Sequence, residues 1–399
     1  MHAALYLNFY IQSNLLAEKF QEGYVICGIV GVVAFTAIGT TALGPVRRWS
    51  YRVFYVTHVV LATLLLPVLW FHVSHLRVYL YETAAVYAVN VLLRGMSSKT
   101  VSASLRVLEQ GTMVEITIPL ASAGKQKRHL QRYQPGQHAY LSLPGHAASR
   151  TSRSNPFSVA SVPSVDNELR FVARILDGNT AVLATAAKLD GKHEVTIEGP
   201  YGLAAHAEKL LTFDRVFFVA GGVGGTFIAP LYRQLLADLS PSPGSHRRQK
   251  VSFVWIARAV EDVDWAMPRE DDEKRGFLER LQVWITQAGS HSRRQGGVGF
   301  DTGYPDDGDE GIELQESKGL ITQDVGEREA DLKATGLTLR SGRPDSKRLL
   351  EETFSCGVNE RVAVVVCGPG SLSRALRDDV GLWVDAGRDV WFWDEGFAL

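Results

Sequence analysis

Cysteine is scarce in this sequence, and neither sign of charge is in excess. The 399 residues include three cysteines, Cys27, Cys356 and Cys367, and none forms a C-x-x-C pair. Zinc sites and disulfide-stapled secreted domains usually show close cysteine spacings, so neither is expected and a reducing compartment is favoured. The formal net charge of -1 argues against a nucleic-acid partner. The length suits two or three domains.

The N-terminus lacks the pattern of a cleavable signal peptide, because no basic segment precedes a small-residue cleavage site. Residues 1–16 instead resemble the end of a further membrane helix already in progress. His2 is either a functional residue of that helix or an ordinary N-terminal residue.

Charge is absent from two long apolar runs, residues 24–43 and 53–73, and a third run over 79–93 contains only Glu82. About 20 apolar residues are needed to cross a bilayer as a helix. We therefore predict membrane spans at about 24–44, 53–73 and 77–94. Together they form a membrane segment over residues 1–98 that lies in a lipid bilayer.

Basic residues predict which side of the membrane each loop faces. Arg47, Arg48 and Arg52 lie between the first two spans, and Arg94 and Lys99 follow the third. Loops rich in lysine and arginine face the cytoplasm. Everything after residue 98 is therefore expected in the cytosol, in a multi-pass protein.

Two histidines, His58 and His72, lie inside the second run. Fourteen residues of helix advance about 21 Å and complete nearly four turns, so both imidazoles project from one face. Imidazole is an axial ligand of haem iron, and ionisable groups inside membranes are functional candidates. The pair predicts two stacked haems. The alternative is histidines that bond to backbone carbonyls.

The pattern changes beyond residue 99, where short β-branched or apolar stretches are separated by glycine and proline turns. Such closely spaced strands without long helices predict a small antiparallel barrel over 99–207. The expected strands are residues 101–108, 113–118, 138–143, 169–174 and 194–197.

A dinucleotide-type domain is predicted over 208–399. An apolar strand at 213–220 enters Gly221-Gly222-Val223-Gly224-Gly225-Thr226 and a helix over about 227–239. Glycines let a backbone approach a pyrophosphate, and a helix N-terminus offers oriented N–H groups. Strands at 251–257 and 361–367 follow, the second entering Gly368-Pro369-Gly370. This βα alternation favours a parallel, doubly wound sheet.

Two arginines are candidates for a 2′-phosphate site, Arg258 after the second strand and Arg343 in Gly342-Arg343-Pro344. Either could instead be a solvated surface residue. Residues 290–341 are rich in glycine and charge, without periodicity, and predict a flexible insertion whose aspartates belong to a solvated loop rather than a metal site.

In this order, the histidine-bearing segment, the barrel and the dinucleotide domain resemble the fungal ferric reductase family, whose relatives include the NADPH oxidases. The spacing of His58 and His72 resembles a haem-ligand pair of that family. Asn155-Pro156-Phe157-Ser158 resembles its flavin motif H-P-F-[ST], with Asn155 in place of histidine. Residues 135–138, ending at His138, resemble the stretch before that motif.

The resemblance implies roles for further residues. Arg174, Asn179 and Thr180 are implied at the FAD pyrophosphate, and Gly199 and Gly202 in the turn that closes the flavin domain. The NADPH loops are implied at Gly221, Gly222, Gly224 and Thr226 and at Cys367, Gly368 and Pro369. Ser158 would orient the flavin, and Cys367 would lie near the nicotinamide without acting as a nucleophile. Phe397 or Trp393 would cover the flavin.

The family implies a ferric-chelate reductase that passes electrons from cytosolic NADPH through FAD and haem b to external ferric or cupric chelates, for metal uptake. The fold class implied is a transmembrane helical segment, an antiparallel FAD-binding barrel and a Rossmann-like NADPH domain, together ferredoxin reductase-like. His2 is the one candidate for the family's other histidine pair, which suggests an N-terminally truncated member. Plasma membrane is expected, with a vacuolar location open.

Two other functions remain open from the residues. An NADPH oxidase would deliver the electrons to oxygen, and nothing in the sequence separates oxygen from metal as acceptor. A truncated, non-catalytic or diaphorase-only member would retain the cytosolic half alone.

Overall fold

The computed structural model describes residues 2–108, 112–144, 155–176, 178–189, 191–202, 205–239, 250–268, 271–286, 336–355, 357 and 359–396. The chain divides into two units. The described part of the first ends at Gly95, and the second begins at Met96. Each unit is described by itself.

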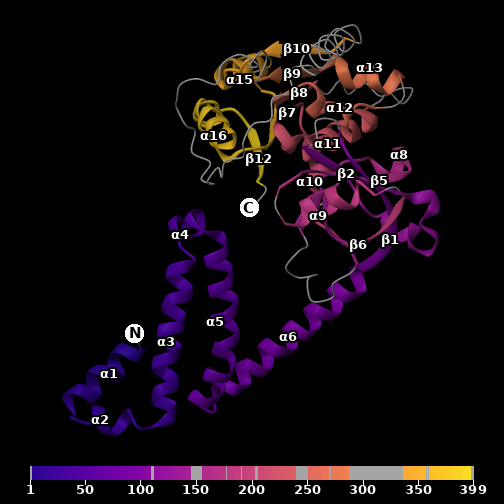
Figure 1. Ribbon diagram of the computed structural model, residues 1–399. Helices are drawn as coiled ribbons and strands as arrows, with labels where there is room; N and C mark the ends of the chain where they lie inside the picture. The colour runs from indigo at the N-terminus through magenta and orange to yellow at the C-terminus, as the bar shows by residue number, and fades with distance from the viewer. Residues whose placement is uncertain are drawn as a thin grey trace, which may run out of the picture. The chain divides into compact units, whose positions relative to one another are not determined.

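The first unit is entirely helical in its described part, and two of its helices, α3 and α5, run side by side (Figure 1). Both are long and apolar enough to cross a membrane. The Ser50 hydroxyl caps α5 by accepting a hydrogen bond from the Val53 N–H. The helices are α1 (His2–Gln12), α2 (Leu16–Lys19), α3 (Gly23–Thr41), α4 (Gly44–Trp49), α5 (Tyr51–His72) and α6 (Leu76–Ser97).

The third predicted span coincides with α6, a helix of 22 residues. It does not reach the apolarity of α3 and α5. Tyrosines, Glu82 and Asn90 dilute its aliphatic residues, which accounts for the difference. Large apolar side chains point outward on all three helices, for example Val33 at 63% exposure and Phe71 at 68%. Exposing so large an apolar surface to water is energetically unfavourable, whereas lipid can surround it, so these helices suit a bilayer.

A six-stranded antiparallel sheet opens the second unit, with strand order β4-β3-β6-β1-β2-β5. Its edges approach each other where the Ala160 N–H donates to the Arg170 carbonyl at 2.8 Å, so the sheet curls into a near-barrel. The apolar side chains of alternate positions fill the interior. The strands are β1 (Ser98–Val107), β2 (Met113–Pro119), β3 (His138–Ser142), β4 (Asn155–Ser158), β5 (Glu168–Arg174) and β6 (Lys192–Tyr201).

Six parallel strands form the second sheet, in the order β10-β9-β8-β7-β11-β12. The order reverses between β7 and β11, as in doubly wound folds. The strands are β7 (Arg215–Gly221), β8 (Lys250–Ala257), β9 (Leu281–Ile285), β10 (Thr338–Ser341), β11 (Val362–Cys367) and β12 (Val390–Glu395), and the main helices are α11 (Gly225–Asp238), α13 (Asp271–Glu279), α15 (Ser346–Phe354) and α16 (Gly370–Asp385).

The central strands of this sheet are buried on both faces, which explains their unbroken apolar sequence. Along β7, Val216 and Phe218 join one core and Phe217 and Val219 the other. β10 corrects the expected end of the insertion, because Thr338–Ser341 pairs with β9 and is not a loop. The rest of the expected insertion, residues 290–335, lies outside the described residues. The predicted succession of antiparallel barrel and parallel sheet is confirmed.

Candidate functional site

The carboxyl ends of the parallel strands bring the predicted dinucleotide residues to one edge. Gly221 pairs with Ile256, Ala257 with Ile285, and Ser341 with Ile285, so β7, β8, β9 and β10 end level with one another. β11 ends level with them, because Cys367 pairs with Ala220. Ligands of doubly wound sheets bind at this edge, where the strand order reverses.

The two glycine loops touch at that reversal. A Cβ at Gly224 would lie 2.1 Å from the Cys367 carbonyl oxygen, and one at Gly221 would lie 2.7 Å from Cδ of Pro369. A Cβ at Gly368 would meet the Gly221 backbone at 3.0 Å. Only glycine therefore allows the two loops to approach this closely. Because glycine has no side chain, the loop backbone is uncovered at the carboxyl ends of β7 and β11.

The first turn of α11 follows the glycine loop directly. Among the described side chains, none caps its N-terminus, but the N–H of its first residue, Gly225, donates to the Gly222 carbonyl, so the N–H groups after Gly225 are the candidates to meet an anion. The Thr226 hydroxyl donates to the Val223 carbonyl at 2.8 Å, and the Trp255 indole N–H donates to the Gly222 carbonyl at 3.0 Å. Both bonds fix the loop conformation, although only Thr226 was predicted from the sequence. Gly222 has a φ of +53, which glycine adopts without strain.

Arg258 and Arg343 lie just beyond the level ends of β8 and β10, and both are exposed. The N–H groups of Arg258 and Ala259 donate to the Asp262 carboxylate at 3.3 Å, which shapes the loop after β8. Both guanidinium groups thus belong to the same edge as the glycine loops. That placement fits a phosphate monoester on a bound dinucleotide.

Cys367 ends β11 and is fully buried. Burial raises the pKa of its thiol far above the usual value, with Glu395 and Asp394 adding to the effect. A raised pKa disfavours the thiolate at neutral pH, which agrees with the expectation that Cys367 does not act as a nucleophile. Its carbonyl, by contrast, lies against the first glycine loop.

The predicted flavin strand, β4, pairs with β3 in the register His138 to Ser158 and Tyr140 to Pro156. Ala139 and Phe157 also pair, and both point into the barrel core. Alternation in β3 therefore puts His138 and Tyr140 on the outer face with Ser158. Ser158 is 7% exposed, whereas Asn155 and Pro156 are exposed.

Aromatic rings surround His138 on that outer face. Its ring centroid lies 6.1 Å from that of Tyr140 and 5.9 Å from that of Tyr201, which donates to Glu198 at 2.7 Å. Burial lowers the pKa of His138 despite the opposing effect of Glu395. A neutral imidazole between aromatic rings can pack against a flat, conjugated ligand.

The turn at the end of β6 approaches the same strand closely. Gly199 and Gly202 have φ values of +148 and +96. A Cβ at Gly199 would lie 3.1 Å from the Tyr133 hydroxyl, and one at Gly202 would lie 3.6 Å from Nδ1 of His138. Both predicted glycines thus permit the turn to pack against β3.

The three residues implied at the FAD pyrophosphate lie together at the other end of the barrel. Arg174 ends β5 and is exposed. Asn179 opens α9 (Asn179–Ala186) and donates to the Leu141 carbonyl at 3.0 Å, while the Thr180 hydroxyl bonds to the Leu176 backbone. Both buried side chains are occupied within the fold, so the exposed guanidinium and the α9 backbone amides are the groups free to meet an anion.

The C-terminal strand β12 brings Trp393 to the barrel. Its ring lies 5.3 Å from Phe227 and 5.0 Å from His206, and it is 8% exposed. This packing leaves Trp393 little surface to cover a flavin. Phe397, the other candidate, lies outside the described residues.

Both histidines of the predicted pair lie on α5, as expected. His72 Nδ1 is 2.7 Å from the Tyr24 carbonyl oxygen, and its ring occupies the space beside Gly28, where a Cβ would lie 2.6 Å from Cε1. His58 is exposed, with its ring 5.5 Å from Phe54. The side chain of His2, at the start of α1, lies outside the described residues.

This arrangement fits both interpretations of His72, a histidine bonded to a backbone carbonyl and a haem ligand. A ligating histidine usually donates its other ring N–H to a carbonyl or carboxylate, which fixes its tautomer and orientation. The bond to Tyr24 occupies Nδ1 and leaves Nε2 for iron. Among the described residues, no cluster of three or more histidine, cysteine, aspartate or glutamate side chains could hold a metal ion.

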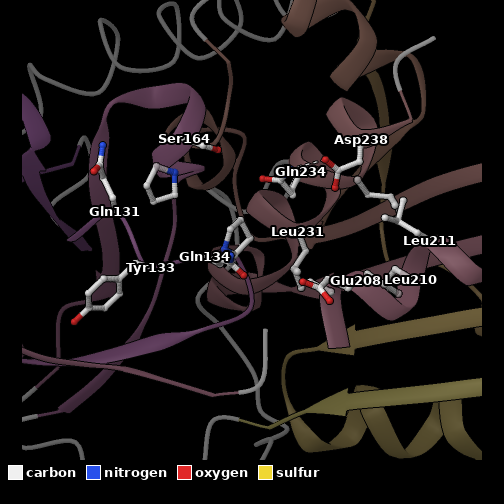
Figure 2. Close-up of a pocket in the computed structure, with 14 residues that line it drawn as sticks. Gln131, Tyr133, Gln134, Ser164, Glu208, Leu210, Leu211, Leu231, Gln234 and Asp238 are labelled. Carbon is white, nitrogen blue, oxygen red and sulfur yellow. Dashed lines mark hydrogen bonds between the residues drawn. The ribbon is translucent and has the colours of Figure 1, made fainter. Parts of the chain in front are cut away.

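A cavity of about 300 Å³ opens between the barrel and the second half of α11 (Figure 2). Gln131 and Gln134 line one side, and Leu231, Gln234 and Asp238 line the other. It lies beyond the glycine loop along α11, so it is separate from the dinucleotide edge. In Figure 2 the Tyr133 hydroxyl points away from its centre.

A near-barrel followed by a doubly wound sheet, with glycine loops at the reversal point, defines a ferredoxin reductase-like flavoprotein attached to membrane-type helices. Three family models match the chain in this order: ferric reductase like transmembrane component over 1–69, FAD-binding domain over 98–205, and ferric reductase NAD binding domain over 213–380. The chain therefore belongs to the ferric reductase family, as the sequence motifs predicted.

Individual relatives support the same assignment. Ferric reductase transmembrane component 3 of Saccharomyces cerevisiae is 23% identical over 95% of this chain and 51% of its own length. Probable cell surface ferric reductase kap2 of Aspergillus oryzae is 27% identical over 60% of this chain and 33% of its own. NADPH oxidase 4 of Rattus norvegicus is 27% identical over 46% and 26%. The chain thus spans about half of the yeast relative and a third or less of the other two.

Several residues of the site were not predicted from the sequence. Trp255 holds the glycine loop, Tyr140 and Tyr201 flank His138, and Tyr24 orients His72. The acceptor from Tyr24 is a backbone carbonyl, which no side-chain pattern reveals. The positions of Tyr140 and Tyr201 beside His138 could be inferred only once the strand register was known.

Proposed function

We propose that this protein is a transmembrane ferric-chelate reductase that passes electrons from cytosolic NADPH through FAD and haem b to ferric or cupric chelates outside the membrane, for metal uptake. The observation that carries the proposal is one chain that joins a histidine-bearing, membrane-type helix to a flavin-type barrel and a dinucleotide-type sheet. The family and its yeast and Aspergillus relatives support iron as the acceptor. When bound, NADPH supplies a hydride, FAD divides its two electrons, and haem carries single electrons.

The dinucleotide edge binds and orients NADPH in this proposal. The bare backbone of Gly221, Gly224 and Gly368 admits the pyrophosphate, and the first turn of α11 donates N–H groups to it. Arg258 and Arg343 contact the 2′-phosphate, which gives preference for NADPH over NADH. The carbonyl side of Cys367 borders the nicotinamide, and its buried thiol takes no chemical part.

The barrel binds and orients FAD. The outer face of β3 and β4 carries the flavin ring, with the Ser158 hydroxyl as a hydrogen-bonding group and His138 beside it. Tyr140 and Tyr201, which lie beside His138, would exclude water from one side of the flavin ring. Arg174 and the N-terminus of α9 hold the pyrophosphate.

His72 and His58 are proposed to supply one axial ligand each to two haems, with His2 as a further candidate ligand. The bond from His72 Nδ1 to Tyr24 supports this, because Nε2 would then be the ring nitrogen that could bind iron. The positive-inside pattern supports a cytosolic location for the second unit. The plasma membrane is the proposed location, because the Aspergillus relative is a probable cell surface ferric reductase.

Purified full chain in detergent, supplied with FAD and haem, tests the proposal. We expect NADPH-dependent reduction of ferric citrate that is faster than with NADH and that persists in the presence of superoxide dismutase. An Arg258→Ala variant should lose most of the preference for NADPH. Reduction that occurs equally with NADH in the wild type would contradict the NADPH assignment.

A second function, production of superoxide, is favoured by the similarity to NADPH oxidase 4. Full suppression of ferric reduction by the dismutase would show oxygen as the direct acceptor. A third, diaphorase activity of the cytosolic unit alone, would appear as reduction of soluble dyes without a haem signal.

A further inference from the structure

Two buried arginines form hydrogen bonds between the FAD-binding barrel (β1–β6) and the dinucleotide half (β7–β12). We call the boundary between these two halves the seam. Arg233, on α11, is 6% exposed. Its Nη1 and Nη2 donate to the two carboxylate oxygens of Asp166 at 3.1 and 2.8 Å. Asp166 ends α8 (Pro163–Asp166), a helix of the barrel half. The same guanidinium donates to Glu273, on α13 of its own half, at 2.7 and 2.9 Å.

Arg170 makes the second crossing, in the opposite direction. It lies on β5 of the barrel and is 7% exposed. Its Nη1 donates at 2.8 Å to the carbonyl of Trp265, which follows α12 (Glu261–Asp264) in the dinucleotide half. Glu115, on the barrel, balances its charge at 3.5 Å.

Each arginine is connected to a predicted binding segment, Arg233 through helix α11 and Arg170 through backbone hydrogen bonds. Arg233 follows Gly225 by eight residues on one continuous helix, about 12 Å along α11 from the glycine loop. The Arg170 carbonyl accepts from the Ala160 N–H, and the Arg170 N–H donates to the Ser161 hydroxyl, two and three residues after Ser158. The seam contacts thus connect the dinucleotide loop to the flavin strand through few intervening residues.

The electrostatics make the Arg233 contact sensitive to its partners. Burial alone would lower the pKa of the guanidinium, but Asp166 and Glu273 outweigh it and raise the pKa. Arg233 therefore remains charged, and a charge buried in this way depends on its carboxylates. A bidentate arginine–carboxylate pair also fixes direction as well as distance, since both N–H groups must align.

We propose that Asp166, Arg170 and Arg233 are positioning residues that set the orientation of the nicotinamide-binding half against the flavin face. The inference rests on the proposed function, because the orientation matters for hydride transfer. In that transfer the C4–H bond of the nicotinamide would break and its hydrogen would pass with both bonding electrons to N5 of the flavin, forming an N–H bond there and leaving NADP⁺ and the anionic two-electron-reduced flavin. A misplacement of about 1 Å can slow such a step by about a hundredfold.

Asp166→Asn and Glu273→Gln form a matched pair for the test. Each removes one carboxylate charge from Arg233 and leaves the other, but only Asp166 lies across the seam. In the full chain loaded with FAD, stopped-flow absorbance measures flavin reduction at saturating NADPH, and titration measures NADPH affinity. We expect Asp166→Asn to slow reduction about tenfold or more with unchanged affinity, and Glu273→Gln to change the rate less than twofold.

Hydrogen–deuterium exchange on the chain without nucleotides gives an independent readout. We expect faster exchange in α11 for Asp166→Asn than for Glu273→Gln. Equal effects of the two variants on both the rate and the exchange would overturn the proposal, as would no effect of either. If NADPH does not reduce the wild-type flavin, the proposed function fails. The comparison of exchange rates would still show whether Asp166 holds α11 against the barrel. Arg170→Lys, which keeps the charge but loses the planar fork, repeats both measurements should Asp166→Asn misfold.

Discussion

At the scale of single residues, the two glycine loops approach each other most closely between Gly224 and Cys367. A methyl group at Gly224 would lie 2.1 Å from a backbone oxygen, and neither backbone can move without separating β7 from β11. We predict that Gly224→Ala destabilises the protein by about 1–3 kcal/mol and weakens NADPH binding. Thermal unfolding monitored by intrinsic fluorescence measures the first effect.

Gly276→Ala is the control for this substitution. Gly276 lies inside α13, and nothing lies within 4 Å of its added methyl group. Alanine favours helix by up to about 1 kcal/mol over glycine, so the control should keep or raise the melting temperature. A Gly224→Ala protein as stable as this control would show that the two loops are not packed as described.

His138 predicts a pH dependence at the same scale. Burial lowers its folded-state pKa below the unfolded value. The unfolded chain therefore binds more protons as the pH falls below about 6.5, and stability must decrease from that pH down to the lowered pKa. The melting temperature of the wild type should fall more between pH 7.5 and 5.5 than that of His138→Gln. Equal falls in the two proteins would refute this assignment.

At the scale of elements, the packing of α3 on α5 determines how His72 is held. Gly28 leaves room for the imidazole, and Tyr24 accepts its hydrogen bond one helical turn earlier. We predict that Gly28→Val displaces the ring and lowers haem b content by about tenfold, the lower end for loss of a supporting contact to a metal ligand. A reduced-minus-oxidised absorbance spectrum, normalised to protein, measures the loss.

Gly39→Val provides the comparison on the same helix. Nothing lies within 4 Å of a Cβ at Gly39, so this variant should keep its haem. Similar haem contents in both variants would show that the contact between Gly28 and His72 does not support a ligand.

Most elements were predictable from local sequence patterns, and the exceptions have physical causes. The charge-free runs predicted α3 and α5, because a helix long and apolar enough to cross a membrane leaves a continuous apolar signal. The apolar run before Gly221 predicted β7, because that strand is buried on both faces. β10 was missed because its sequence, Thr338–Ser341, is short and polar, and its pairing with β9 comes from a segment far away along the chain. The seam residue Arg233 was missed because a charge on a helix usually faces water.

At the scale of the whole molecule, the order of the parts is the order that the proposed electron path from NADPH to an external acceptor would require. The glycine loops, the outer face of β3 and β4, and the two histidines of α5 each offer the groups that one cofactor requires. The glycine loops and the histidines of α5 could be picked out from the sequence because their residue types are distinctive, and their cofactor roles stay predictions. Their neighbours were not, because tertiary packing alone selects them.

The most direct test of the account is an anaerobic mixing experiment on the full chain loaded with FAD and haem. After NADPH is added, absorbance spectra follow the flavin and haem bands over time. The account predicts loss of the flavin absorbance followed by the bands of reduced haem b, with the haem phase absent in His72→Ala. Flavin reduction without any haem signal in the wild type would contradict transmembrane electron transfer and leave a diaphorase.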